Sequence, residues 1–245
     1  MKILVCISVV PDTTSKISFK DNDTKFVSDG VQFIINPYDE MALSKSLEIT
    51  ESLGGTITVI NVGLADTEAN IRKALAIGAN DAVRINAEPK DAMFVATQIS
   101  NVVKNENYDL IFTGRESIDH NGGLVCGLLA EMLNIPSVNV VSKIEIEGSK
   151  IKATRDIDGG REELECTMPC VISAQKDLSE ARIPNMRGIM AARTKPLKVV
   201  DAVSENDFSE FVNFELPPAK TGVKLIDAEN AGELIDLLRN EKKLI

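Results

Sequence analysis

The residues best suited to chemistry lie in one stretch, YDLIFTGRESIDHNGGLVCGLLAEML. Residues 109–113 have the composition of a buried strand, and a helix is predicted to open near Gly122 and Gly123. A helix that begins at the carboxyl edge of a parallel sheet presents unpaired backbone N–H groups, which bind phosphate. Asp119 and Asn121 suit either helix capping or contact with a ribose. The segment alone is equally compatible with a capped helix after a glycine turn.

Few other residues are suited to catalysis. His120 is the only histidine, it lies inside the same polar stretch, and nothing in the sequence resembles a catalytic triad. No dinucleotide motif GxGxxG follows the first strand, and no phosphate-binding motif GxxxxGK[ST] occurs. The sequence therefore indicates a binding function rather than bond chemistry by this chain alone.

The cysteines give no sign of a metal site. The four of them, Cys6, Cys126, Cys166 and Cys170, contain no CxxC pair. With a single histidine, the chain offers too few ligands for a zinc site. We expect all four cysteines to be small apolar core residues of a protein from a reducing cytoplasm.

Composition and charge exclude several classes of function. The chain has 245 residues, of which 44% are hydrophobic and 26% charged, as in an ordinary soluble domain. A net charge of −10, an aromatic content of 4% and the absence of tryptophan argue against a nucleic acid partner. No apolar run is long enough to span a bilayer. The apolar N-terminal run lacks a small-residue cleavage site, so we interpret it as a first strand.

The first half of the chain alternates between strand patterns and helix patterns. This order predicts an α/β fold with a doubly wound parallel sheet. Asn36 suits the N-cap of the first helix, and Pro37 suits its first turn. Residues 17–35 alternate around DNDT and SDG and predict a hairpin. Strands are predicted at 3–10, 56–62, 82–86 and 109–113, and helices from Pro37 to Gly54, from Asp66 to Gly78 and over 90–104.

The pattern changes after Pro136. Three strand patterns, at 137–147, 150–157 and 163–175, are joined by short turns, and we expect them to extend the sheet in antiparallel fashion. Residues 176–198 have no clear period and carry six basic residues against two acidic ones. Because this basic loop also contains isoleucine and methionine, it is a candidate docking element for another protein.

The last segment is expected to lack a core of its own. Residues 201–224 contain two consecutive prolines and few helix signals, which predicts an irregular arm. The closing helix has an apolar stripe made of Ala231, Leu234, Ile235 and Leu238. We divide the chain into a nucleotide-binding α/β domain at 1–200, which includes the docking loop 178–196, and an arm and helix at 201–245. The arm and helix must pack either back on the domain or onto another subunit, and we expect a partner subunit.

Seven collinear segments, spread from residue 1 to the end, carry a resemblance to a known family. They are ILVCISVVPD, INPYDEMAL, IRKALAIGANDAVRI, GRESIDHNGG, RDIDGGREELECTMPCVISA, ARIPNMRGIMAARTKPL and PPAKTGVKL. Together they resemble the beta subunit of electron transfer flavoprotein. The resemblance implies an α/β fold with a doubly wound parallel sheet of the adenine-nucleotide-binding type, an antiparallel hairpin extension and a C-terminal arm plus helix.

The resemblance also implies a function. Members of this family are heterodimers, in which the alpha subunit holds a redox FAD and the beta subunit holds a buried AMP without a redox role. The pair collects electrons from flavoprotein dehydrogenases, such as the acyl-CoA dehydrogenases of fatty acid oxidation, and delivers them to a membrane quinone reductase. By this resemblance the chain is a cytoplasmic electron-carrier subunit with no catalysis of its own.

The same resemblance assigns residues to two sites. The phosphate is expected on the backbone N–H groups of Gly123, Leu124 and Val125, and Met186 matches the apolar side chain that anchors partner dehydrogenases. The residues expected at the nucleotide are Cys6, Asn36, Pro37, Tyr38, Asp39, Val62, Gly63, Gly114, Arg115, Asp119, Asn121, Gly122, Gly123, Leu124 and Val125. The residues expected at the partner are Arg182, Ile183, Pro184, Met186 and Arg187.

Some positions depart from the family pattern. The family's loop usually has the sequence Gln-x-x-Asp-x-Asp-x-x-Gln-[TV]-Gly, whereas Glu116, Asn121, Leu124 and Cys126 occupy four of its places here. A glutamate beside a phosphate is unfavourable unless it points away or pairs with Arg115. Contacts through the backbone need only the helix start and do not depend on these side chains.

Three alternatives remain open. A bifurcating member of the same family would hold a second FAD in this subunit, although DIDGGREEL resembles the AMP-holding branch more. A stand-alone adenine-nucleotide-binding sensor of the same fold would need neither the basic loop nor the arm. An enzyme that activates a substrate with ATP would carry an SGGxDS-type loop after the first strand, where this chain has VVPDTTSK.

Overall fold

The computed structural model describes residues 1–204, 208–220 and 222–245 and has the predicted α/β class. Its strands are β1 (Lys2–Cys6), β2 (Val9–Pro11), β3 (Phe19–Lys20), β4 (Lys25–Phe26), β5 (Phe33–Ile35), β6 (Thr56–Val62), β7 (Asp81–Asn86), β8 (Leu110–Gly114), β9 (Ser137–Glu147), β10 (Lys150–Ile157), β11 (Gly160–Thr167), β12 (Cys170–Ala174) and β13 (Leu197–Asp201). Its α-helices are α1 (Pro37–Leu53), α2 (Glu68–Ile77), α3 (Ala92–Val103), α4 (Val125–Leu133), α5 (Met186–Ala192) and α6 (Ala231–Asp236). Short turns of helix, η1 (Ala65–Thr67), η2 (Ala228–Asn230) and η3 (Leu237–Glu241), complete the described elements.

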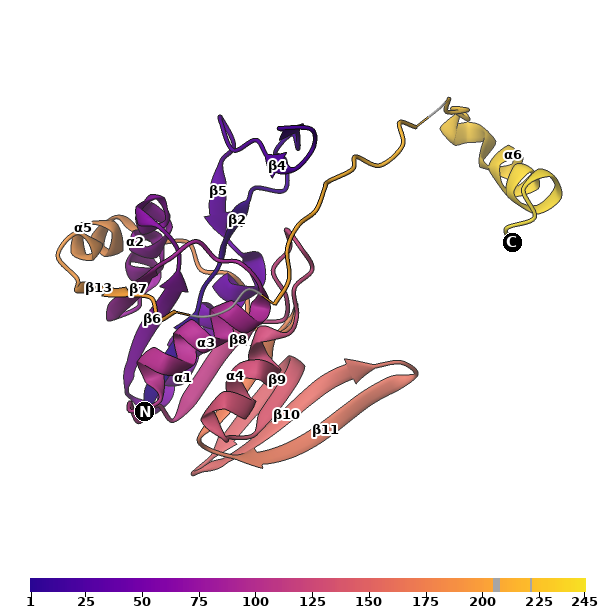
Figure 1. Cartoon of the computed structure of the whole chain (residues 1–245). Coiled ribbons are helices and arrows are strands. Elements are labelled where there is room, and N and C mark those ends of the chain that lie inside the picture. Colours follow the sequence, from indigo (N-terminus) through magenta and orange to yellow (C-terminus); the bar gives the residue numbers. More distant parts are fainter. Residues whose placement is uncertain (205–207, 221) are drawn as a thin grey trace.

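Within the described residues, nine strands form one sheet in the order β11-β10-β9-β12-β8-β1-β6-β7-β13 (Figure 1). The seven strands from β9 to β13 in this order are parallel. β10 and β11 add two antiparallel strands at one edge. Since β1 lies at the centre of the parallel part, the loops that follow β1, β6 and β8 meet at the same edge of the sheet.

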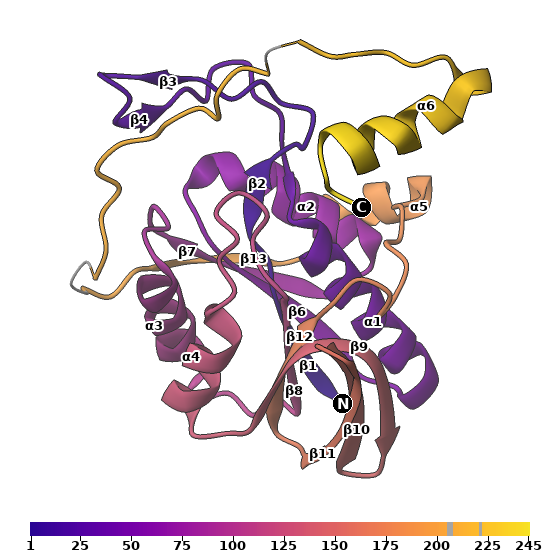
Figure 2. The same ribbon diagram turned by 90° about the vertical axis from the view of Figure 1, so that its right-hand side faces the viewer.

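Helices cover both faces of the parallel sheet. α1 and α2 lie on one face, and α3 and α4 lie on the other (Figure 2). Side chains of β1 alternate between the two apolar clusters beneath them, with Ile3 and Val5 on the first face and Leu4 and Cys6 on the second. Burial on both faces explains why the first strand is a continuous apolar run in the sequence.

Two helix starts differ in detail from their prediction. α1 has Asn36 at its N-cap position and Pro37 at its first position, as predicted, but the Asn36 side chain makes no capping hydrogen bond. α2 begins after the turn η1, and its N-cap position is Thr67. The predicted helix start at Asp66 is therefore too early, because a tight 3₁₀ turn precedes the helix there.

The region after α4 differs most from the sequence prediction. The expected strand at 163–175 is two strands, β11 and β12, which separate at Met168 and Pro169. Proline has no N–H for a strand ladder, so it favours a break there. β12 returns to the parallel sheet between β8 and β9, and only β10 and β11 form the antiparallel extension. β13, which pairs in parallel with β7, was not predicted from the sequence.

Two segments extend beyond the sheet. The predicted hairpin at 17–35 is present in part, because β3 pairs with β4 inside it, whereas β5 pairs with β2. The predicted strand at 3–10 is therefore wrong as a single strand: β1 ends at Cys6, and β2 leaves the main sheet to pair with β5. After β13 the chain continues as an arm to α6, which lies apart from the sheet in Figure 1. None of the residues of α6 is buried. In the described part of the chain, no helix is both long enough and apolar enough to cross a membrane.

Candidate functional site

The candidate site lies at the carboxyl edge of the sheet, where β1, β6 and β8 end side by side. β1 pairs in parallel with both of the other strands, so Cys6, Val62 and Gly114 mark one edge. Most of the predicted nucleotide residues lie at or directly after these three strand ends. The others, residues 36–39, lie at the start of α1, which Asp39 bonds to Gly114. The fold therefore brings together segments that are about 50 residues apart in the chain.

Asp39 joins the start of α1 to the ends of β1 and β8. Its Oδ2 accepts hydrogen bonds from the backbone N–H and the hydroxyl of Ser8, both at 2.7 Å, and its Oδ1 accepts one from the Gly114 N–H at 2.8 Å. Burial raises the pKa of the Asp39 carboxyl to about 6, although the bonds from Ser8 and Gly114 act in the opposite direction. Asp39 thus fixes the two strand ends against each other.

Asn36 holds the loop that precedes α4. Its Nδ2 donates to the backbone oxygen of Glu116 at 2.8 Å, and its Oδ1 accepts from the N–H of Ile118 at 3.3 Å. The side chain is only 1% exposed. These two bonds explain why Asn36 does not cap α1, and they connect the first helix to the polar loop predicted to bind phosphate.

Two glycines permit close packing at the strand ends. A Cβ atom on Gly114 would lie 2.2 Å from Oδ1 of Asp39, and one on Gly63 would lie 2.6 Å from Oδ1 of Asn61. Distances this short exclude a side chain at either position without movement of the neighbouring groups. The predicted site glycines after β6 and β8 are therefore required by the protein's own packing.

Two buried polar residues near Gly63, Asn61 and Arg84, were not predicted from the sequence. Arg84 Nη1 donates to the Gly63 oxygen at 2.9 Å. Asn61 Nδ2 donates to the Ile7 oxygen at 2.9 Å, and its Oδ1 accepts from the Thr67 hydroxyl at 2.9 Å. Both residues are buried polar groups inside apolar strands, TITVINV and DAVRIN, which is a signal that the sequence did contain.

The start of α4 offers backbone donors to a ligand. The helix begins at Val125, later than the predicted opening at Gly122 and Gly123, and no side chain caps it. Unpaired N–H groups at such an end carry partial positive charge. A Cβ atom on Gly123 would lie 3.3 Å from the Arg115 oxygen, so this position is tight on the side of the loop. The donor set fits a phosphate group.

The charged side chains of the loop are paired within it. Glu116, unfavourable beside a phosphate if left alone, has its carboxylate 3.8 Å from Nε of Arg115. Asp119 Oδ1 accepts a hydrogen bond from the His120 N–H at 2.9 Å, and Asn121 takes a left-handed turn with φ of +50°. Neither Asp119 nor Asn121 caps α4, so that part of their prediction is wrong.

Cys6 and Val62 contribute core side chains beneath the site. Both are buried in the apolar cluster under α3 and α4, and burial raises the pKa of the Cys6 thiol well above its usual value. Cys126 and Cys170 are buried as well, whereas Cys166 is partly buried. The prediction of core cysteines is thus confirmed for three of the four.

Comparison with known proteins decides the family. The family described as "Electron transfer flavoprotein domain" matches residues 23–205. The chain is 37% identical over 259 residues to the electron transfer flavoprotein subunit beta of Bacillus subtilis, with all of both chains covered. The chain belongs to the electron transfer flavoprotein beta subunit family. The same subunit of Syntrophomonas wolfei is 35% identical, with 100% of this chain and 98% of the relative covered, and that of Homo sapiens is 30% identical, with 94% of each covered.

Membership confirms the resemblance seen in the sequence. Beta subunits of electron transfer flavoproteins are electron carriers, and the family implies an alpha subunit as partner and a flavin in the heterodimer. The carboxyl edge described above is the candidate cofactor site of this family member. The basic loop is its candidate docking surface.

Apolar side chains stand out from the docking loop of this family member. Ile183 is 91% exposed and Met186 is 74% exposed, and Met190 and Ile189 of α5 are also exposed. Arg182 forms two hydrogen bonds to Glu51 of α1, at 2.6 and 2.8 Å. The structure therefore uses Arg182 to fasten the loop, while the apolar side chains remain uncovered by their own chain.

α5 and the residues after it are tied to α2. Arg72 Nη1 donates to the backbone oxygens of Ala192 and Lys195, at 2.8 and 2.7 Å. Lys195 Nζ donates to the backbone oxygens of Leu75 and Ala79, at 2.8 and 2.6 Å, where a cation suits the end of a helix. These contacts present the docking loop in one fixed position.

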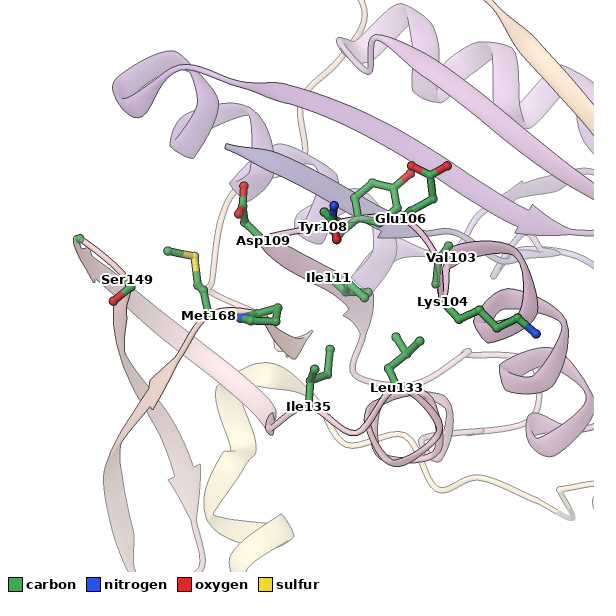
Figure 3. A pocket seen from close by; sticks show the side chains of 13 residues that line it. Val103, Lys104, Glu106, Tyr108, Asp109, Ile111, Leu133, Ile135, Ser149 and Met168 are labelled. Atoms are coloured by element: carbon green, nitrogen blue, oxygen red, sulfur yellow. The ribbon is translucent and has the colours of Figure 1, made fainter.

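A cavity of about 560 Å³ lies at the opposite, amino edge of the sheet. Its walls include Val103, Ile111 and Leu133 together with Met168 (Figure 3). Two of its acidic groups already bond to Lys2: Asp109 accepts from the Lys2 N–H, and Glu106 pairs with the Lys2 ammonium. None of the predicted nucleotide residues lines this cavity, so it is separate from the candidate site.

Proposed function

We propose that this chain holds AMP as a structural ligand at the carboxyl edge of its sheet. With its alpha subunit it carries electrons from flavoprotein dehydrogenases of the acyl-CoA dehydrogenase type to a membrane quinone reductase. The observation that carries the proposal is the uncapped start of α4, which follows the end of β8 through a loop that Asn36 and Asp39 hold at Glu116 and Gly114. Free thiols at all four cysteines suit a cytoplasmic protein.

Each part of the site has a defined task in this proposal. The N–H groups of Gly123, Leu124 and Val125 receive the phosphate, because they combine free donors with the positive end of a helix. Asn36 keeps the loop in reach of the ligand, and Asp39 keeps the strand ends together. Redox chemistry is supplied by the FAD of the heterodimer when it is bound, and this chain's residues only bind and position.

The docking loop supplies the contact with dehydrogenases. Ile183 and Met186 are large apolar side chains on a loop whose own position is fixed by Arg182 and Lys195. Such exposed side chains bind best in a pocket of the partner, since burial removes them from water. Arg187 and Arg193 add positive charge to this loop and steer encounter with an acidic surface.

The nucleotide site is tested by Gly123→Val. A branched side chain at this position blocks the approach of a phosphate to the α4 start and crowds the Arg115 oxygen. We expect the heterodimer with Gly123→Val to retain little or no AMP, measured by chromatography of the nucleotides released on denaturation. Gly160→Val is the matched control, because nothing lies within 4 Å of a Cβ there. Equal AMP release from both variants would contradict the site.

A further inference from the structure

We propose that residues 208–214, here called the strap, form a gate over the nucleotide site and control the binding and release of AMP. This inference rests on the proposed function, because it assigns a regulation to the same site. The strap belongs to the first part of the arm. Just before it, Val203 is held by its own subunit: its N–H and C=O both bond to the side chain of the buried Gln98 of α3, at 2.8 and 2.9 Å.

Asp91 anchors one end of the strap. Its Oδ2 accepts hydrogen bonds from the Phe208 N–H at 3.1 Å, the Ser209 N–H at 3.0 Å and the Ser209 hydroxyl at 3.3 Å. Its Oδ1 accepts a bond from the Phe94 N–H at 2.8 Å and so caps α3. Asp91 therefore holds the helix and the strap with different oxygens.

A row of stacked rings fastens the other end of the strap. The ring of Phe211 stacks on His120 with centroids 4.8 Å apart, and Phe214 stacks on Phe211 at 5.4 Å and on Phe19 at 4.9 Å. The Phe214 N–H also donates to the Asp23 oxygen at 2.7 Å. His120 lies in the loop before α4, and Phe19 and Asp23 lie in the hairpin after β2.

The strap thus joins three features of the same edge of the sheet. The start of α3 follows β7, the loop with His120 follows β8, and the hairpin follows β1 and β2. In the sheet, β6 and β1 lie between β7 and β8, so a segment that joins these loops crosses the strand ends that carry the candidate site. Among the described residues, the strap is held there by one carboxylate oxygen, one row of rings and the backbone bond from Phe214 to Asp23. An attachment through so few contacts allows local opening.

Asp91→Asn separates the two tasks of the anchor. Asparagine is as good an N-cap as aspartate, so α3 keeps its cap. The asparagine amide, however, has only one oxygen that can accept hydrogen bonds, and its nitrogen can only donate. The strap's N–H groups then lose their acceptor. Phe211→Ala releases the other end by removing the central ring of the row. Phe208→Ala is the matched control, because this ring is 61% exposed and its backbone N–H remains available to Asp91.

The test measures AMP exchange in the heterodimer with the alpha subunit. Radiolabelled AMP is bound, its release into excess unlabelled AMP is timed, and its association rate is measured separately. A gate slows both directions, so Asp91→Asn and Phe211→Ala should each speed association and dissociation by about threefold or more, whereas Phe208→Ala should match the wild type.

Three results would overturn the gate. Unchanged rates in both strap variants would mean that the strap does not control the site. Faster dissociation with unchanged association would mean that the strap only stabilises the bound state. In both cases wild-type AMP binding, and with it the proposed function, would stand. A wild-type heterodimer that neither contains nor binds AMP would instead refute the proposed function, and the gate with it.

Discussion

Asp39 is a buried carboxylate that receives three hydrogen bonds from Ser8 and Gly114. Its pKa in the fold is about 6, above the ordinary value of 3.8 that it regains on unfolding. The folded state therefore binds the Asp39 proton more tightly than the unfolded state. By linkage, the contribution of this group to stability is greatest at low pH and falls as the pH rises from about 4 to about 6.

This linkage gives a prediction for Asp39→Asn. A pKa shift of one unit corresponds to about 1.4 kcal/mol. The ionised Asp39 carboxylate therefore lowers the free energy of unfolding by roughly 3 kcal/mol at neutral pH, relative to the protonated form. Asparagine cannot ionise, and the unfolding free energy of wild type minus that of the variant should fall between pH 4 and pH 6. Urea unfolding of both proteins across this range measures the difference. A difference that rises with pH, or stays constant, would contradict the buried charge.

Single residues also show where the sequence was sufficient and where it was not. The resemblance to the family assigned Asn36, Asp39 and Gly114 to the site, and each stands beside a predicted strand end or helix start. It misjudged what Asn36 bonds to, since the partner Glu116 lies 80 residues further along the chain. Only the folded chain brings that backbone oxygen to the amide, so a local rule assigned the side chain to the nearest helix instead.

The proposed function of the docking loop depends on the exposure of its apolar side chains. Its frame is fixed by bonds from Arg182 to Glu51 and from Lys195 to the end of α2. A Cβ atom on Gly188 would lie 2.3 Å from the Ala76 oxygen, so α5 also packs closely against α2. Truncating an exposed apolar side chain should therefore leave the loop in place and remove only its contact with a partner.

We predict that Met186→Ala and Ile183→Ala each weaken binding to a partner dehydrogenase by roughly 1–3 kcal/mol, the range for an interface anchor. The flavin spectrum should not change, because the substitutions remove surface atoms only. Steady-state reduction of the heterodimer by an acyl-CoA dehydrogenase measures the effect. Ile157→Ala, at an exposed position of β10, is the control. If both loop variants are reduced as efficiently as this control, the loop does not dock dehydrogenases.

Elements with a strong local pattern were predicted well, and those defined by tertiary pairing were not. β9 and β10 have the predicted bounds, because each lies between clear turns. β12 could not be placed from its sequence, since insertion between β8 and β9 depends on partners far away in the chain. β13 could not be predicted for a similar reason, since its half-exposed residues LKVVD pair only with β7 at the sheet edge.

At the scale of the whole molecule, the arm has two parts with different surroundings. Residues 203 and 208–214 contact α3, the site loop and the hairpin of their own subunit. Beyond them, α6 has no buried residue, and Leu234 and Ile235 of the predicted apolar stripe are exposed.

The sequence predicted an arm from its prolines, but the strap was not foreseen, because stacking of Phe211 on His120 joins residues about 90 positions apart. That α6 packs on the alpha subunit stays a prediction.

In the function proposed above, this subunit holds AMP and the redox flavin belongs to the heterodimer. The most direct measurement is the nucleotide content of the purified heterodimer, determined by denaturation and quantitative chromatography. We expect one FAD and one AMP for each heterodimer. Two FAD and no AMP would contradict it and indicate a bifurcating carrier, and FAD without any second nucleotide would contradict the nucleotide site itself.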